Sequence, residues 1–155
     1  MLVGLGNCFY DTKQTVRAIE FYKKALDMDD SLGDVHYNIA NCYQLAIQYD
    51  EAITHYQRAL DLKPNKFEIH YNLGNALSNS GRYVEATDCF LKTLQLEPEN
   101  MAAIYNLGNC YYMTGKYQDS IEQYSKALLL DENNAECHFN LGTAYYDLKQ
   151  KDKAL

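Results

Sequence analysis

The stretch Tyr71-Asn72-Leu73-Gly74-Asn75 decides the fold, because near-copies of it recur at one fixed spacing along the chain. The small residues at its fourth position stand 34 residues apart in successive copies: Gly6, Ala40, Gly74, Gly108 and Gly142. A strict period of this length is typical of repeat arrays, in which each unit packs chiefly on its neighbours. The 155 residues are therefore predicted to form a solenoid rather than an ordinary globular domain.

Two amphipathic helices are expected in each period, since two apolar patterns at helical spacing flank a short polar turn. In the third period these patterns are Ile69, His70, Leu73, Leu77 and then Tyr83, Ala86, Phe90, Leu94. The expected helices are 2–13, 15–28, 33–46, 49–62, 67–80, 83–96, 101–114, 117–130 and 135–148, with a stub at 151–155.

These helices make one array over 1–155, with repeats at about 1–32, 33–66, 67–100 and 101–134 and a partial repeat at 135–155. Solenoids need polar capping units at their ends. Because the last repeat stops early in its second helix, we expect the chain to be a piece of a longer array.

The ends of the helices carry recognisable signals. Pro64 and Pro98 are expected to end the helices before them, because proline lacks an amide hydrogen. Asp29-Asp30-Ser31 and Asn133-Asn134 offer side chains that can cap the following helix. Three further residues, Lys13, Ile47 and Lys149, replace the glycine found at the turn as Gly81 and Gly115. A β-branched residue tolerates positive φ poorly, so a different backbone geometry is expected at these turns.

Composition excludes several classes of partner and compartment. The net charge is −7 and the basic residues are scattered, which disfavours nucleic acid and anionic membranes. Hydrophobic residues make up 47% of the chain, but no apolar stretch is long enough to insert into a membrane. Five cysteines occur without a Cys-x-x-Cys pair, and no secretory segment is present. The prediction is a cytoplasmic protein in a reducing compartment.

No enzyme signature emerges, so no catalytic residue, cofactor or metal site is predicted. Gly4-Leu5-Gly6-Asn7-Cys8-Phe9 lacks the last glycine of a dinucleotide loop and lies inside an expected helix. There is no phosphate-binding Walker loop and no nucleophile elbow. His36, His70 and His138 share one repeat position, so each lies at least a full repeat from the next, and no metal-ligand spacing occurs.

The repeat resembles the tetratricopeptide repeat family, whose helix–turn–helix units hold small residues at the eighth and twentieth positions. The eighth position carries the five small residues above, and the twentieth carries Ala18, Ala52, Ala86, Ser120 and Ala154. The twenty-fourth carries aromatic residues: Tyr22, Tyr56, Phe90 and Tyr124. The resemblance covers nearly the whole chain and implies an all-α fold, a right-handed superhelix or α-solenoid.

In this family the first helices line a concave groove that takes a peptide or a helix of a partner. Two rows of asparagine fall on these helices: Asn38, Asn72, Asn106 and Asn140, and then Asn7, Asn41, Asn75 and Asn109. Each asparagine offers one acceptor and two donor hydrogens, so such a ladder can pair with successive backbone groups of a ligand. It is similar to the substrate-binding superhelix of O-linked N-acetylglucosamine transferases. The alternative is that these asparagines bind between repeats.

The predicted groove is aromatic and mildly acidic. It adds Tyr112, Tyr146 and Glu68 to the candidate peptide-binding residues, beside Asp34, Glu136 and the row Tyr37, Tyr71, Tyr105 and Phe139. That row can equally pack between repeats. A partner segment with basic and apolar residues is therefore expected. The cation positions of the family's carboxylate clamp would fall on Val3, Glu68 and Asn72, or one repeat later on Tyr37, Ala102 and Asn106, so acidic chaperone tails are disfavoured.

The predicted function is a protein–protein interaction scaffold that binds a peptide or helical segment in its concave groove. One alternative is the substrate-recognition arm of a larger enzyme, such as a glycosyltransferase. Another is a structural subunit that stacks within a large assembly, with self-association through the open ends of the array.

Overall fold

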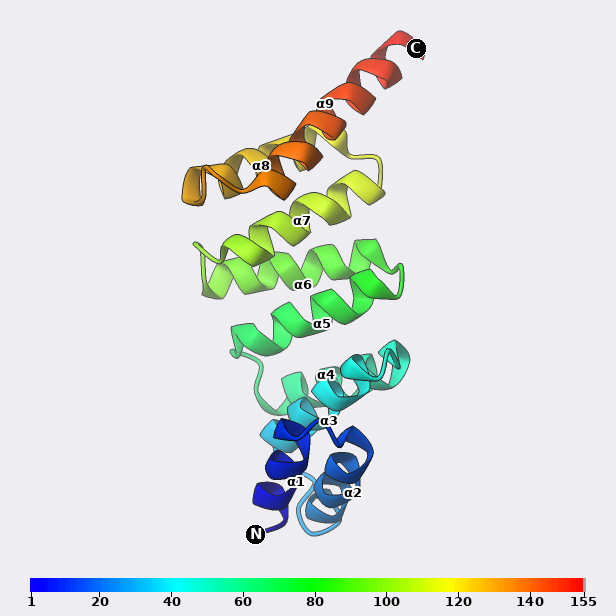
Figure 1. The fold of residues 1–155 in the computed structure, drawn as a ribbon, viewed down its shortest axis with the longest axis vertical. Helices are drawn as coiled ribbons and strands as arrows, with labels where there is room; N and C mark the ends of the chain where they lie inside the picture. The colour runs from blue at the N-terminus through cyan, green and yellow to red at the C-terminus, as the bar shows by residue number, and fades with distance from the viewer. Residues whose placement is uncertain (155) are drawn as a thin grey trace. The chain divides into compact units, whose positions relative to one another are not determined.

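A computed structural model describes residues 1–154, with side chains as far as Lys151. Within these residues the chain forms nine α-helices and no strand, as Figure 1 shows. The contacts divide the chain into two compact units, Met1–Ser80 and Gly81–Leu155. The predicted all-α solenoid fold is confirmed.

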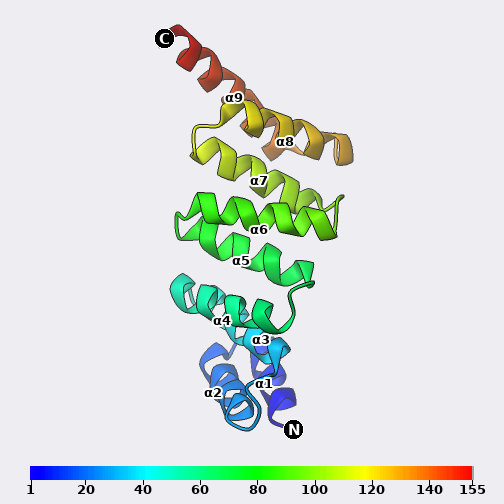
Figure 2. The same cartoon turned by 180° about the vertical axis from the view of Figure 1, so that it is seen from behind.

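The first unit consists of five helices that pack in chain order. They are α1 (Leu2–Asp11), α2 (Thr15–Leu26), α3 (Gly33–Leu45), α4 (Tyr49–Leu62) and α5 (Phe67–Asn79). Each helix contacts the next, and α3 also contacts α5. Figure 2 shows the same succession from behind. One core cluster of this unit consists of Ala18, Tyr22, Val35, Ile39 and Cys42.

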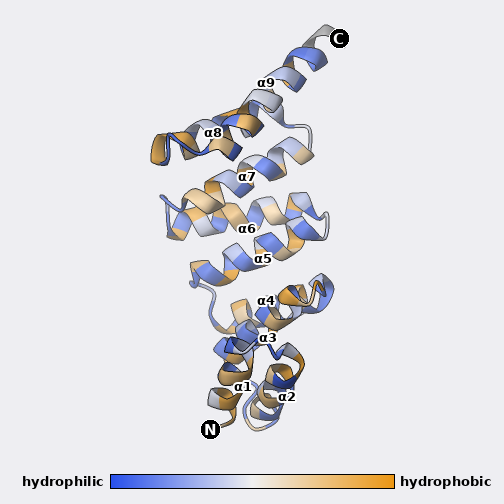
Figure 3. Ribbon diagram, viewed as in Figure 1, coloured by the Kyte–Doolittle hydropathy of each residue, from blue (hydrophilic) through white to orange (hydrophobic). Residues whose placement is uncertain are grey.

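The second unit holds α6 (Tyr83–Leu96), α7 (Met101–Met113), α8 (Tyr117–Leu130) and α9 (Ala135–Ala154). Again each helix packs on the next. Its core cluster consists of Ile104, Ile121, Tyr124, Ala127, Cys137 and Ala144. In Figure 3 hydrophobic and hydrophilic residues alternate along individual helices, as expected where one face is buried and the other is in water.

In two repeats the small residue of the first helix lies against the aromatic ring of the second helix. A methyl group added at Gly108 would lie 2.7 Å from Cε1 of Tyr124, closer than carbon atoms pack. Gly6 stands over Tyr22 in the same way. The rings at this position, Tyr22, Tyr56, Phe90 and Tyr124, are all at most 1% exposed. Glycine therefore lets the two helices of a repeat approach over a large buried ring.

The predicted helix bounds agree with the structure to within two residues except at the C-terminal end. There the expected break before the stub at 151–155 is wrong, because α9 continues through Lys149 to Ala154. Leu155, the last residue of that expected stub, lies outside the described residues. In both views the end of α9 projects away from α7 and α8 (Figures 1 and 2).

The expectation of a different turn geometry at Lys13 and Ile47 is also wrong. Their φ angles are 59° and 62°, in the same left-handed region as those of Gly81 and Gly115. The reason is a shared set of hydrogen bonds that closes the preceding helix. The amide of Gln48 donates to the carbonyl of Tyr43 at 2.9 Å, as the amide of Lys116 does to that of Tyr111 at 2.9 Å. This C-terminal motif requires a left-handed residue whatever its side chain.

The helix-end signals are confirmed in part. The helices α4 and α6 end before Pro64 and Pro98 as expected. Asn134 caps α9, because its Oδ1 accepts from the amide of Cys137 at 2.9 Å. The expected cap at Asp29-Asp30-Ser31 is wrong: α3 begins after Leu32 without a side-chain cap. Asp29 instead accepts hydrogen bonds from the amide and hydroxyl of Ser31, within the loop itself.

Candidate functional site

The first helices of the repeats carry both asparagine rows. In each unit we call the surface that these helices form the A-helix surface: α1, α3 and α5 in the first unit, and α7 and α9 in the second. The eight asparagines are half-buried except Asn7, which is exposed. Seven of the eight predicted asparagines are therefore partly covered by neighbouring side chains.

The second row of asparagines holds the buried tyrosines of the second helices. The carboxamide oxygens of Asn7, Asn41 and Asn109 accept hydrogen bonds from the hydroxyls of Tyr22, Tyr56 and Tyr124 at 2.8, 2.6 and 2.6 Å respectively. A buried phenol needs such a partner, because an unpaired hydroxyl is costly to bury. Burial is also the main cause that raises the pKa of Tyr22 and of Tyr124, each to about 12.

The first row ties one repeat to the next. Asn72 donates to the hydroxyl of Tyr37 at 2.8 Å, and Asn140 donates to that of Tyr105 at 2.7 Å. Asn38 also reaches back to Asn7, at 3.3 Å. These bonds support the structural interpretation of the ladder. A carboxamide has two donor hydrogens and an acceptor oxygen, so each of these asparagines keeps hydrogen-bonding capacity beyond its bond to the preceding repeat.

Tyr37 and Tyr105 of the tyrosine row pack on the buried tyrosine of their own repeat, and their hydroxyls accept from Asn72 and Asn140 of the next repeat. The ring of Tyr37 lies 6.0 Å from that of Tyr56, and the ring of Tyr105 lies 5.8 Å from that of Tyr124. Phe139, at the same repeat position, differs because it is 73% exposed.

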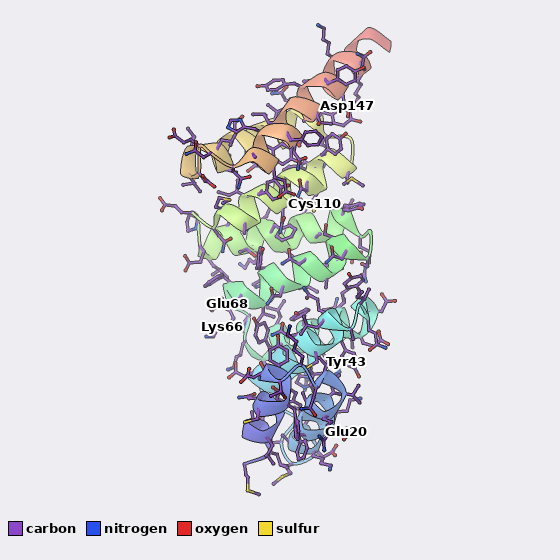
Figure 4. All side chains as sticks on the ribbon, viewed as in Figure 1. Glu20, Tyr43, Lys66, Glu68, Cys110 and Asp147 are labelled. Carbon is purple, nitrogen blue, oxygen red and sulfur yellow. The ribbon has the colours of Figure 1, made fainter. Side chains whose placement is uncertain are left out.

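The remaining predicted site residues lie at the rim of the A-helix surface. Tyr112 donates a hydrogen bond of 2.5 Å to Asp147 on α9, and this bond raises the pKa of the Tyr112 phenol. Tyr146 is 64% exposed. Glu68 stands at the start of α5 next to Lys66 (Figure 4).

Two groups of side chains on or beside these surfaces were not predicted from the sequence. Asp147 follows Tyr112 by 35 residues, the same separation as the pairs Tyr37–Asn72 and Tyr105–Asn140, so the period could have found it. The other group is basic: Lys63 forms an ion pair with Asp34, and Lys66 lines a pocket with Glu68. These lysines lie in the loop before α5, where no groove residue was expected.

Three pockets lie on the A-helix surface. Two are in the first unit: one of about 160 Å³ lined by Asp34, Tyr37, Lys66, Glu68 and Ile69, and one of about 270 Å³ lined by Tyr10, Tyr37, Asn41, Gln44, Leu45 and Asn72. The largest, of about 400 Å³, is in the second unit and is lined by Tyr105, Asn109, Tyr112, Met113, Tyr124, Glu136, Phe139, Asn140 and Thr143.

The histidines serve the fold. Nδ1 of His36 and Nδ1 of His55 are 3.1 Å apart between α3 and α4. Burial lowers the pKa of both, that of His55 to about 4. Nε2 of His70 bonds to the carbonyl of Pro64 at 2.9 Å, and His138 bonds in the same way to Glu132 at 2.8 Å.

The described residues also bear on metal binding, membrane insertion and disulfide bonding. No group of three or more His, Cys, Asp and Glu side chains there could hold a metal ion. No described helix is long and apolar enough to cross a membrane. None of the five cysteines, all within the described residues, forms a disulfide bond, and burial raises the pKa of Cys42 to about 11.

Models of known families match this chain over most of its length. Tetratricopeptide repeat models match residues 1–31, 67–100 and 89–122, and a TPR repeat model matches residues 48–81 and 108–149. The chain belongs to the tetratricopeptide repeat family. A search of curated proteins found no significant match.

Several solved structures share the fold of this tetratricopeptide repeat (TPR) chain. A crystal structure of MamA is 23% identical with a TM-score of 0.90, and the match covers 96% of this chain and 87% of MamA. YrrB, described as a TPR protein with an unusual peptide-binding site, is 24% identical with a TM-score of 0.90, over 99% and 79% of the two chains. Pseudomonas aeruginosa PilF is 26% identical with a TM-score of 0.79, over 96% and 68%.

Proposed function

We propose that this TPR chain is a protein–protein interaction scaffold that binds an extended segment of a partner along its A-helix surface. The observation that carries the proposal is a pocket that recurs at equivalent positions in the two units. Tyr37, Asn41 and Asn72 line it in the first unit, and their counterparts two periods later, Tyr105, Asn109 and Asn140, line it in the second. Each unit therefore offers the same aromatic and carboxamide groups to a partner segment.

The asparagines contribute a fixed set of donors and acceptors to these pockets. Because Asn72 and Asn140 are already held by a tyrosine of the preceding repeat, little side-chain entropy is lost when they bind a ligand. Their remaining donor and acceptor groups can pair with the backbone of a partner. This use of asparagine would parallel the O-linked N-acetylglucosamine transferase superhelix. YrrB, a TPR protein of the same fold, has a peptide-binding site.

Selection from a random peptide library tests the proposal. Binding of the selected peptides is compared between the wild type and two variants that block the pockets, Leu45→Arg and Thr143→Arg. Matched controls are Gln57→Arg and Gln118→Arg, at exposed positions of α4 and α8. We expect a blocking variant to lose peptides that both controls retain. Equal binding by all four variants, or no enriched peptide, would contradict the proposal.

A second candidate function is stacking against another chain, and an apolar pocket favours it. This pocket, of about 500 Å³, lies on α1, α2 and the loop after α2 and is lined by Met1, Leu2, Val3, Ala25, Met28, Asp29 and Leu32. Met28 is 80% exposed there. Sedimentation at increasing concentration would show association in the wild type and its loss in Met28→Lys. A monomer at every concentration would exclude this function for the chain.

A further inference from the structure

The pocket of the second unit has an aromatic wall and an open ring at its mouth. Tyr105 and Tyr124 form the wall, with ring centroids 5.8 Å apart. Phe139 lines the same pocket, yet 73% of its surface is exposed. An aromatic face left open to solvent at a pocket attracts a cation, because the face of the ring is electron-rich.

The charge of this pocket is negative. Glu136 is its only charged lining residue, and it is exposed. Among the described residues Glu136 forms no ion pair, because the acidic partners of the basic side chains are Asp30, Asp34, Asp61, Glu85 and Glu122. Burial first and then the neighbouring Glu136 carboxylate raise the pKa of the Tyr105 phenol. A carboxylate has two oxygens, so Glu136 can accept from a ligand as well.

A second carboxylate lies next to the pocket. Asp147 accepts the hydrogen bond of Tyr112, which lines the pocket, and Figure 4 marks Asp147 on α9. Two lysines near this end of the unit lie over other aromatic rings. Lys116 stands 5.7 Å from the ring centre of Tyr111, and Lys151 stands 5.8 Å from that of Tyr117. Neither lysine lines the pocket.

The two comparable pockets of the first unit lack this combination. In one, Lys66 is part of the lining and Asp34 is neutralised by Lys63. The other has tyrosine rings and carboxamides but no carboxylate. Glu68 also lines the first of these two pockets, but beside Lys66, so the second-unit pocket is the one of the three whose carboxylate has no basic side chain in its lining.

We propose that this pocket binds one arginine side chain of the partner segment, with the guanidinium between the Glu136 carboxylate and the Phe139 ring. Arginine fits better than lysine, because its planar guanidinium both stacks on rings and donates to a carboxylate in a fork. The inference rests on the proposed function, since it names the side chain that the A-helix surface selects.

The test uses the full chain and three short peptides. They are acetyl-Ala-Leu-Arg-Leu-Ala-amide and its analogues with citrulline or lysine in place of arginine. Citrulline keeps the shape of arginine and removes the charge. Backbone amide NMR shifts are followed during titration to millimolar peptide. We expect shifts centred on residues 136–143 with the arginine peptide, and binding about tenfold weaker with citrulline.

Variants then assign the binding to the two named groups. Glu136→Gln and Phe139→Ala should each weaken the arginine peptide about threefold to tenfold. Glu132→Gln removes an equal charge from the loop before α9 and should leave affinity unchanged, since Glu132 does not line the pocket. Each variant must keep the wild-type spectrum away from residues 136–143, because both replaced side chains are exposed.

Several results would overturn the inference. Equal affinity for the arginine and citrulline peptides would show that the charge does not contribute to binding. Tighter binding of the lysine peptide would show that the pocket does not select a guanidinium. Chemical-shift changes only outside residues 136–143, or no changes at all, would show that the peptide does not bind in this pocket. Library peptides that bind the A-helix surface without a basic residue would contradict this inference and leave the proposed function intact. Loss of all peptide binding would contradict both.

Discussion

The carboxamide nitrogen of Asn140 lies 2.7 Å from the hydroxyl oxygen of Tyr105, 35 residues earlier on the preceding first helix. Asn72 and Tyr37 form the same pair in the first unit, at 2.8 Å. Neighbouring repeats are thus joined by a polar bond on the surface that we propose for the partner. Stability and recognition depend on the same side chains.

Replacing Asn140 with alanine should therefore reduce stability as well as binding. The loss expected is about 1 kcal/mol, because one half-buried hydrogen bond disappears and the Tyr105 hydroxyl loses a partner. Chemical denaturation of Asn140→Ala, Tyr105→Phe and the double variant measures the coupling. Gln118→Ala, at an exposed position of α8, is the control. Additive effects of the two substitutions would show that the pair does not act as a bond.

Two glycines at the same repeat position should respond to alanine in opposite directions. At Gly108 a methyl group would lie 2.7 and 2.8 Å from two carbons of the Tyr124 ring. The ring must shift, so Gly108→Ala should cost about 1 kcal/mol even after the gain in helix propensity. At Gly142 nothing lies within 4 Å, so Gly142→Ala should stabilise by about 0.5–1 kcal/mol. Thermal unfolding measures both, and the same sign for the two would contradict the packing argument.

Ile47 is the strained residue of the turns. It is β-branched, its φ is 62°, and its side chain is 72% exposed. Ile47→Gly should raise the free energy of unfolding by about 0.5–1 kcal/mol, since relief of the left-handed strain exceeds the entropy that glycine adds to the unfolded chain. Leu45→Gly, two residues earlier in α3, should destabilise instead. A loss of stability in Ile47→Gly would mean that the isoleucine makes a contact that compensates its strain.

Acid should weaken the first unit through His55. Its pKa is lowered to about 4 from 6.5, mainly by burial and then by the charge of His36, so the unfolded chain takes up the proton first as pH falls. Stability is fully present above the unfolded pKa, declines between about pH 6.5 and 4, and stays reduced below. The loss expected is about 2 kcal/mol, allowing for the partial exposure of His55.

Denaturation curves measured across that pH range test the prediction. His55→Gln keeps a hydrogen-bonding group opposite His36 and removes the titration. The pH dependence should flatten in this variant. An unchanged slope of stability against pH in His55→Gln would show that other groups cause the pH dependence.

Most of the fold could be predicted from the sequence, because the 34-residue period fixes which residues face each other. Small residues such as Gly6 and Ala40 indicated where the two helices of a repeat cross. Aromatic residues such as Tyr22 and Tyr56 indicated which side chains fill the space beside the crossing. The turns at Lys13 and Ile47 were mispredicted because side-chain preference was weighed there without the backbone hydrogen bonds that close the helix. The full length of α9 was not predicted, because this helix was expected to end where the first helices of the earlier repeats end.

The candidate site could be predicted only in part. The period placed the asparagines on the first helices, but Tyr22, Tyr56 and Tyr124 are what occupies the oxygens of the second row. Such bonds depend on the orientation of side chains, which a pattern of residue types does not contain. The lysines before α5 neutralise one end of the first unit's A-helix surface. Their positions could not be predicted either, because they depend on the geometry of that loop. The peptide-binding role of the asparagines, Tyr112, Tyr146 and Glu68 stays a prediction.

The most direct test of the central claim is to map where a selected peptide binds. Backbone amide shifts, or protection from hydrogen exchange, would be recorded for the isotope-labelled chain with and without a peptide enriched from the library. If the peptide binds along the first helices, the changes should be confined to α1, α3, α5, α7 and α9. They should be strongest at the residues that line the pockets. Changes centred on α2, α4, α6 and α8, with the first helices unaffected, would contradict it.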